Sequence, residues 1–134
     1  SLPATEDDVV DQPYKTPSML QKAGVLFSMG FEGSDGNWRQ RDLPFHAGTM
    51  AAYGMTKEEA LSAITLNAAK ILHIADRTGS IEAGKDANVI ISTGDVLDMR
   101  SSVLTHAFIQ GRALNLDNKH SQLFERYKYK YSVK

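Results

Sequence analysis

The first half of the chain alternates short apolar stretches with signals that are typical of helix ends. Thr16 followed by Pro17 predicts a helix start, because threonine caps helices and proline suits a first turn. Gly24 is expected to end that helix in a left-handed conformation. Residues 25–29 are apolar on both faces, which predicts a buried parallel strand. The polar, glycine-rich residues 30–42 are expected to form a loop beyond it, where α/β proteins place active sites.

Three further helices are predicted after this loop. Residues 43–53 indicate a helix with a proline near its start, and residues 56–59 read T-x-x-E, which is a capping box. A short helix is expected over residues 67–72, with its first residue, an asparagine, as the cap. Ile71 and Leu72 are expected to face the core.

The pattern then changes to strands separated by turns. Residues 88–92, 103–109 and 112–116 are predicted strands, and the two-residue connection 110–111 predicts a hairpin between the last two. Asp117 is expected to cap a final helix. The apolar residues of that helix recur at helical spacing: Leu123, Phe124, Tyr127 and Tyr131.

This order predicts an α/β fold in which a segment with one strand and several helices precedes a small β unit. A lone buried parallel strand is awkward for a complete domain, because parallel strands need neighbours. The pattern therefore favours a fragment of a larger fold. With 42% hydrophobic residues, the 134-residue chain is ordinary for a soluble protein.

The charge balance argues against two classes of partner. Fifteen basic residues nearly cancel sixteen acidic ones, so we expect neither nucleic acid nor a membrane as partner. No apolar run approaches the roughly 20 residues that span a bilayer. The absence of cysteine excludes thiolate metal sites and cysteine nucleophiles.

The residues themselves do not form a complete catalytic or metal-binding motif. None of the four histidines is paired with another ligand at metal-binding spacing, and His73, His106 and His120 are expected to have structural or solvated roles. His46 is the histidine beside the candidate loop. In that loop, Glu32 or Asp35 could act as a general base or hold a metal; the alternative is a solvated loop whose charges pair with one another.

Several separate strings resemble the amidohydrolase superfamily, in the order in which that family has them. Residues 43–56 and 59–72 resemble its last barrel segment, and residues 76–89 resemble the passage that leaves the barrel. Residues 108–112 resemble the closing hairpin of the small β-sandwich that follows. The nearest group is the imidazolonepropionase-like amidohydrolases, and the resemblance covers roughly residues 20–116.

The resemblance implies a parent enzyme with a (β/α)8 barrel that hydrolyses C–N bonds of amides or cyclic amides. In such enzymes a divalent metal, usually zinc, lowers the pKa of a bound water. The family's ligands are an H-x-H after the first strand, a mid-barrel lysine or glutamate, two later histidines, and an aspartate after the eighth strand. Residues 25–29 would be that eighth strand. This chain would therefore contain only the last of these ligand positions.

The sequence differs from the family pattern at this ligand position. The resemblance implies that Glu32 stands where the aspartate is expected, with Asp35 three residues later. Glu32 or Asp35 would be the catalytic acid or base, and Glu32 the metal ligand; alternatively, the site has lost its acid. Arg39 and His46 are the candidate substrate-binding residues.

Three segments and two functional hypotheses follow. Residues 1–75 are expected to be the end of the barrel, 76–116 a β-sandwich portion and 117–134 an amphipathic helix. Under the first hypothesis the chain belongs to a metal-dependent hydrolase of a small amide, needs the rest of the barrel as partner, and holds no metal and is inactive alone. Under the second it is a degenerate domain or a non-catalytic module that forms homo-oligomers or binds a partner through exposed apolar faces.

Overall fold

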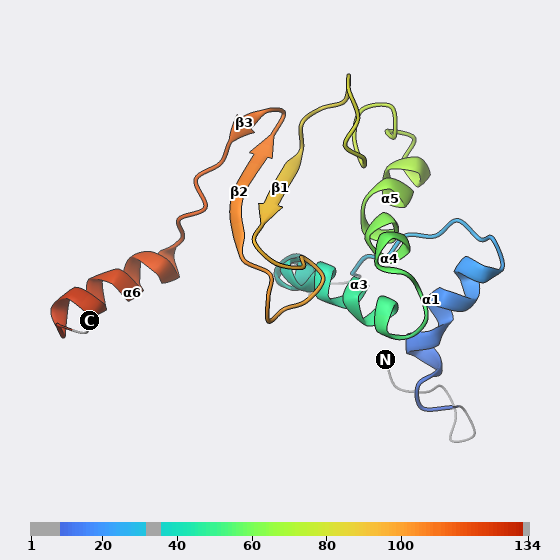
Figure 1. The fold of residues 1–134 in the computed structure, drawn as a ribbon, viewed down its shortest axis with the longest axis horizontal. Helices are drawn as coiled ribbons and strands as arrows, with labels where there is room; N and C mark the ends of the chain where they lie inside the picture. Colours follow the sequence, from blue (N-terminus) through green and yellow to red (C-terminus); the bar gives the residue numbers. More distant parts are fainter. Residues whose placement is uncertain (1–8, 32–35, 133–134) are drawn as a thin grey trace.

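The computed structural model describes residues 9–31 and 36–132, and it shows helices beside a small sheet with one further helix standing apart (Figure 1). Helical elements come first, three strands follow and one helix ends the described chain. The helical elements are α1 (Gln12–Lys22), α2 (Gly36–Arg39), the 3-10 turn η1 (Gln40–Asp42), α3 (Leu43–Ala52), α4 (Lys57–Ile64), α5 (Leu66–Ile71) and α6 (Lys119–Lys130). The strands are β1 (Val89–Ser92), β2 (Leu104–Ile109) and β3 (Arg112–Ala113).

Helix α1 begins earlier than predicted. Its N-cap is Asp11, and Pro13 lies in the first turn, where a missing N–H leaves no intrahelical bond unmade. The prediction that Thr16 is the cap was wrong, because Pro13 starts the helix one turn sooner; the Thr16 hydroxyl instead donates to the Gln12 carbonyl oxygen at 2.9 Å. Gly24 has the expected left-handed conformation, with φ of 72°.

Residues 25–29 are extended but form no strand with any other described residue, so the predicted β-strand was wrong for this chain. Helices hold the segment instead: the Met29 N–H donates to the Ala63 carbonyl oxygen at 3.1 Å, and the Asn67 amide donates to the Phe27 carbonyl oxygen at 3.2 Å. Its first two residues are 47% and 52% exposed. A strand needs a neighbour with which to share backbone hydrogen bonds, and the described residues supply none.

Helices α3 and α4 form where the sequence predicts them. The capping box of α4 is complete: the Thr56 N–H donates to Glu59 Oε2 at 2.8 Å, and the Glu59 N–H donates to Thr56 Oγ1 at 3.2 Å. These two bonds satisfy backbone donors that the helix itself cannot pair. The capping signal in the sequence was therefore sufficient to place this helix start.

Helix α5 differs from its prediction. Its N-cap is Thr65, and the Asn67 side chain accepts a hydrogen bond from Ser62 Oγ at 3.0 Å while its amide holds Phe27, so it does not cap the helix. Ile71 and Leu72 are 43% and 66% exposed, which contradicts their predicted place in the core. Among the described elements, α5 packs closely only against α4.

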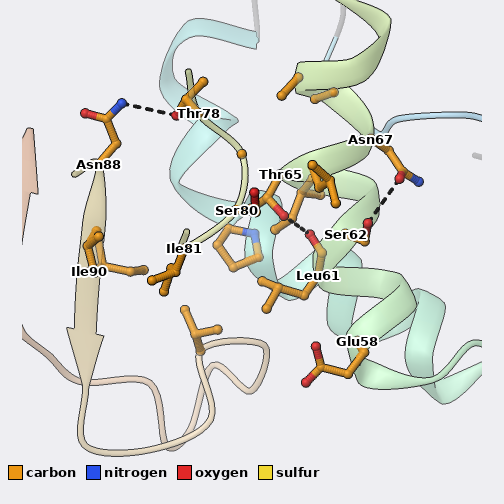
Figure 2. A pocket seen from close by; sticks show the side chains of 18 of the residues that line it. Glu58, Leu61, Ser62, Thr65, Asn67, Thr78, Ser80, Ile81, Asn88 and Ile90 are labelled. Carbon is orange, nitrogen blue, oxygen red and sulfur yellow. Dashed lines mark hydrogen bonds between the residues drawn. The ribbon is translucent and has the colours of Figure 1, made fainter. Parts of the chain in front are cut away.

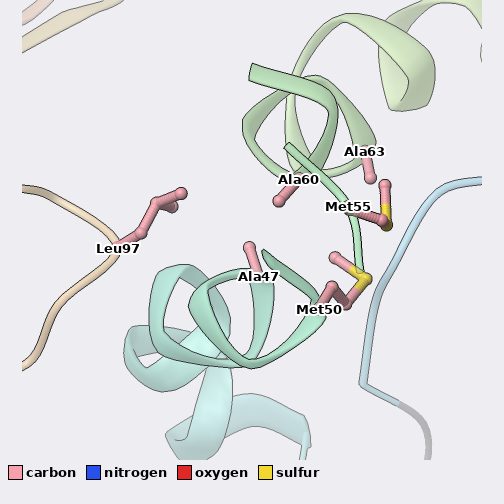
Figure 3. Close-up of a cluster of buried hydrophobic side chains, with 6 residues drawn as sticks. All are labelled: Ala47, Met50, Met55, Ala60, Ala63 and Leu97. Carbon is pink, nitrogen blue, oxygen red and sulfur yellow. The ribbon is translucent and has the colours of Figure 1, made fainter. Parts of the chain in front are cut away.

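The core is small and joins the helices to the loop after β1. Figure 3 shows Leu97 directed from that loop toward Ala47 of α3 and Ala60 of α4. A Cβ atom at Gly48 would overlap the carbonyl oxygen of Leu97, so α3 and the loop approach as closely as a glycine permits. The buried apolar cluster consists of Ala47, Met50, Met55, Ala60, Ala63 and Leu97. The division of the chain at residues 75 and 76 stays a prediction.

The sheet is antiparallel, in the order β1-β2-β3. Val89 pairs with Phe108, and Phe108 also pairs with Ala113, so the predicted hairpin is confirmed. Gln110 and Gly111 both have positive φ, 49° and 76°, which is the conformation that a tight two-residue hairpin turn requires. Strand β3 is shorter than the predicted 112–116.

Helix α6 is capped by Asn118 rather than by the predicted Asp117. The Asn118 side chain accepts from the backbone N–H groups of His120 and Ser121, and the Ser121 hydroxyl accepts from the Asn118 N–H at 3.0 Å. Asp117 accepts a hydrogen bond from Ser121 Oγ instead. None of the helices in residues 9–31 and 36–132 is long and apolar enough to cross a membrane.

Thr56→Ala is expected to lower the free energy of unfolding by about 1 kcal/mol at neutral pH, because it removes a helix cap. The N–H and hydroxyl of Thr56 hold the pKa of Glu59 below its ordinary value. A lowered carboxyl pKa stabilises the fold above the unfolded value and is lost as the pH falls through the folded one. The difference between the two proteins in urea unfolding should therefore shrink below about pH 4. An equal difference at pH 3 and pH 7 would contradict this account.

Candidate functional site

Phe31, at the end of the extended segment, brings together the two residues predicted to bind substrate. The His46 ring meets the Phe31 ring edge-on, with centroids 5.0 Å apart and planes at 81°. The Arg39 guanidinium lies 6.0 Å from the centroid of the same ring. A cation facing an aromatic ring and an edge-to-face aromatic pair are both favourable contacts. The structure therefore places Arg39 and His46 on one aromatic residue.

Consecutive helical turns position this trio. Elements α2, η1 and α3 follow one another without a break from Gly36 to Ala52. Arg39 and His46 are seven residues apart, which is about two helical turns, so they lie on the same side. Pro44 in the first turn of α3 allows the 3-10 turn to continue into the α-helix. Phe31 was not predicted as a site residue, although an aromatic residue next to the acids of the predicted loop was a visible signal.

The two predicted acids, Glu32 and Asp35, lie outside the described residues. Glu32 is the next residue along the chain from Phe31, so the predicted acid follows the residue that contacts Arg39 and His46. Their roles stay a prediction.

The described residues do not form a metal site by themselves. Over 9–31 and 36–132, no group of three or more His, Asp or Glu side chains could hold a metal ion. The other histidines are on separate elements: His73 follows α5, His106 stacks on Phe108 of β2, and His120 lies on α6. A metal near Phe31 would thus need ligands beyond these residues.

A second feature, which the sequence did not predict, is an open groove between the helices and the sheet. Its volume is about 1140 Å³. Figure 2 shows Ile81 and Ile90 on one side and Leu61 on the other. Ile81 is 86% exposed, so an apolar side chain stands in the groove without cover. Large exposed apolar surfaces of this kind mark interaction sites.

The groove has charge of one sign. Among the described residues that line it, only Glu58 and Glu59 are charged, and both lie in the first turn of α4. Glu59 is engaged in the helix cap and also accepts a hydrogen bond from Gln21 at 3.4 Å. Glu58 lies at the edge of the groove without a capping role (Figure 2). The groove is therefore an apolar surface with an acidic edge.

Comparison with known proteins decides the family. The model of the amidohydrolase family matches residues 2–117, which is most of the chain. The chain belongs to the amidohydrolase family. Imidazolonepropionases are among its relatives, so it is an imidazolonepropionase-like member, as its motifs indicated.

Two relatives show how much of such a protein the chain represents. An imidazolonepropionase of Shouchella clausii is 34% identical over 91 residues, which are 67% of this chain and 20% of the relative. An imidazolonepropionase of Bacteroides thetaiotaomicron is 32% identical over 85 residues, which are 63% of this chain and 20% of the relative. The chain thus spans about a fifth of the length of these relatives.

Solved amidohydrolase structures share the fold over most of the chain. An amidohydrolase from Thermotoga maritima superposes with a TM-score of 0.68 and 34% identity, over 76% of this chain and 26% of that one. An adenosine deaminase from Xanthomonas campestris with bound zinc has a TM-score of 0.55 and 21% identity, over 87% of this chain and 33% of that one. This amidohydrolase chain therefore has the fold of part of a TIM-barrel superfamily protein.

Proposed function

We propose that the chain is the C-terminal part of a metal-dependent amidohydrolase that hydrolyses C–N bonds of small amides or cyclic amides. The observation that carries this proposal is the trio of Phe31, Arg39 and His46 at the end of an apolar segment, within a family match from residue 2 to 117. The coverage of about a fifth of each relative supports a longer parent. The exposed apolar residues of segment 25–29 would then pair with the rest of the barrel.

The residues of this chain would have distinct roles in the parent. Arg39 presents a fixed positive charge and His46 a hydrogen-bonding ring, both next to Phe31, so both suit a polar or anionic substrate. Glu32 or Asp35 would accept the proton of the attacking water, as a general base. Because the described residues do not fit a metal by themselves, Glu32 would share it with ligands from the rest of the barrel. Zinc is proposed because a structural neighbour carries it.

Metal removal tests this proposal in the full-length parent. Amide and cyclic-amide substrates, with imidazolonepropionate as the compound after which the relatives are named, would be hydrolysed by the parent as purified. Chelation is expected to abolish the rate, and added zinc to restore it. The 134-residue chain with zinc is expected to be inactive. Unchanged hydrolysis by the metal-free parent, or hydrolysis by the short chain alone, would contradict the proposal.

A further inference from the structure

The end of the extended segment alternates in burial. Phe27, Met29 and Phe31 are half-buried, whereas Ser28 and Gly30 are exposed. Phe27 and Met29 pack against the buried cluster of the helices. Successive side chains of an extended chain point to opposite faces, so Phe31 leaves the segment on the same face as these two residues. The way in which the segment lies on the helices therefore decides where Phe31 points.

Two hydrogen bonds join this segment to α4 and α5 in the part of the chain that the structure describes. The Met29 N–H donates at 3.1 Å to Ala63, in the last turn of α4, where carbonyl oxygens have no partner within the helix. The Asn67 side-chain amide of α5 donates to the Phe27 carbonyl oxygen at 3.2 Å. Residues 27 and 29 present their backbone groups to the same edge of an extended chain. Two bonds along one edge fix the direction of the segment, whereas one bond would leave it free to pivot.

The chemistry of the Asn67 amide suits this contact. The Phe27 carbonyl can only accept a hydrogen bond, so it must face the NH2 group of Asn67. The side-chain oxygen of Asn67 then faces Ser62, whose hydroxyl donates to it at 3.0 Å (Figure 2). Ser62 thereby holds the amide in the orientation that the Phe27 carbonyl needs. A carboxylate of the same shape could only accept, and would leave this partly buried carbonyl without its donor.

Asn67 acts through the segment rather than on the site directly. It lies 40 residues after Phe27 along the chain, and Phe31 is four residues beyond Phe27. An amide that is bonded to Ser62 and Phe27 holds no part of a substrate. Its effect on the site is therefore an effect on where Phe31 is placed.

We propose that Asn67 is a positioning residue for Phe31. By holding the Phe27 carbonyl it fixes the direction of the extended segment, and with it the contacts of the Phe31 ring with Arg39 and His46. The two predicted acids come after Phe31 in the chain, so the place at which their loop begins depends on the same bond. The consequence for catalysis rests on the proposed function, whereas the placement of Phe31 does not.

Nuclear magnetic resonance tests the placement of Phe31 without any substrate. In the 134-residue chain, the His46 ring protons are expected to show a nuclear Overhauser contact with the Phe31 ring, because the ring centroids are 5.0 Å apart. Asn67→Asp keeps the shape of the side chain and the acceptor for Ser62 but removes the donor to Phe27. The contact between His46 and Phe31 is expected to be lost in this variant.

Thr65→Val is the matched control for this measurement. It removes the hydroxyl that donates to the Leu61 carbonyl oxygen at 2.7 Å, at the same junction of α4 and α5, and leaves both bonds to the segment in place. It should keep the contact between the two rings. An unchanged contact in Asn67→Asp, an equal loss in Thr65→Val, or a natural chain without the contact would overturn the proposal.

Ser62→Ala is a milder variant for the case in which circular dichroism shows that Asn67→Asp does not fold. It keeps the amide donor but removes the hydroxyl that orients it. The contact between the Phe31 and His46 rings is expected to weaken, and less than in Asn67→Asp. An unchanged contact in Ser62→Ala would then overturn the proposal.

Kinetics of the full-length parent test the consequence for catalysis. For Asn67→Asp, kcat/KM is expected to fall about 10²-fold, the usual effect of misplacing a site by about 1 Å. KM should rise, because Arg39 and His46 are the candidate substrate-binding residues. Loss of folded protein alone would lower the apparent kcat and leave KM unchanged, and Thr65→Val should leave both unchanged.

The two measurements separate this proposal from the proposed function. A natural parent that hydrolyses no amide would contradict the proposed function alone, and the contact between the Phe31 and His46 rings would still decide the role of Asn67. An active parent in which Asn67→Asp leaves KM unchanged would show that the rest of the barrel holds the segment, and would overturn the positioning role.

Discussion

Glu32→Ala is expected to lower hydrolysis by the full-length parent by about 10²–10⁴-fold, the usual contribution of a general acid or base. Phe31, its neighbour in the chain, contacts both Arg39 and His46, so Glu32 directly follows the residue that joins the two candidate substrate-binding groups. The measurement is the rate at saturating substrate together with the metal content of the purified variant. Loss of rate with loss of metal would identify a ligand, and loss of rate alone a proton acceptor.

Asp35→Ala is the matched comparison, because Asp35 is the other candidate acid in the loop that follows residues 25–29. A large loss in this variant with little effect in Glu32→Ala would move the role to Asp35. Glu32→Asp should keep part of the activity, since the carboxylate is retained with a shorter reach. Unchanged hydrolysis in both alanine variants would contradict the assignment of the site.

Gly48→Ala is expected to lower the free energy of unfolding by about 1–3 kcal/mol, the usual cost of adding a methyl group where no space exists. The new Cβ would overlap the Leu97 carbonyl oxygen, which is backbone and cannot rotate away. Urea unfolding followed by circular dichroism measures the change. Gly30→Ala is the control, because a Cβ there meets nothing within 4 Å and the glycine has no positive φ. Equal stability of the two variants would show that the loop containing Leu97 moves away from α3 at no cost in free energy.

Signals that act within a few residues predicted the structure well. The capping box from Thr56 to Glu59, the left-handed Gly24 and the turn at Gln110 and Gly111 all depend on neighbours in the chain, and all are confirmed. The start of α1 was missed because two proline signals compete within one turn, and the sequence gives no rule for choosing between Pro13 and Pro17.

Signals that depend on distant partners failed. Residues 25–29 have the composition of a buried strand, yet a strand also needs a partner, and the described residues provide none. Ile71 and Leu72 have the composition of core residues but remain exposed for the same reason. Composition fixes what a segment prefers to contact, whereas burial depends on whether that contact is available.

The candidate site was predicted in part. Arg39 belongs to the predicted loop and His46 lies beside it, and the structure brings both onto Phe31. Phe31 was missed because its contacts depend on how α2 and α3 lie against the end of the extended segment. The groove was missed because it depends on how α4, α5 and β1 are arranged in space. The roles of Glu32 and Asp35 rest on the family resemblance and stay a prediction.

The position of Leu97 affects how the chain unfolds locally. Leu97 lies in the loop after β1, and its side chain packs in the helical core. The Lys57–Asp95 ion pair joins the same loop to the first turn of α4. Exposure of that loop would therefore remove buried surface from the helices as well as from the turn. The sheet and the helix that carries His46 should exchange their protected amide hydrogens together, as one cooperative unit rather than two.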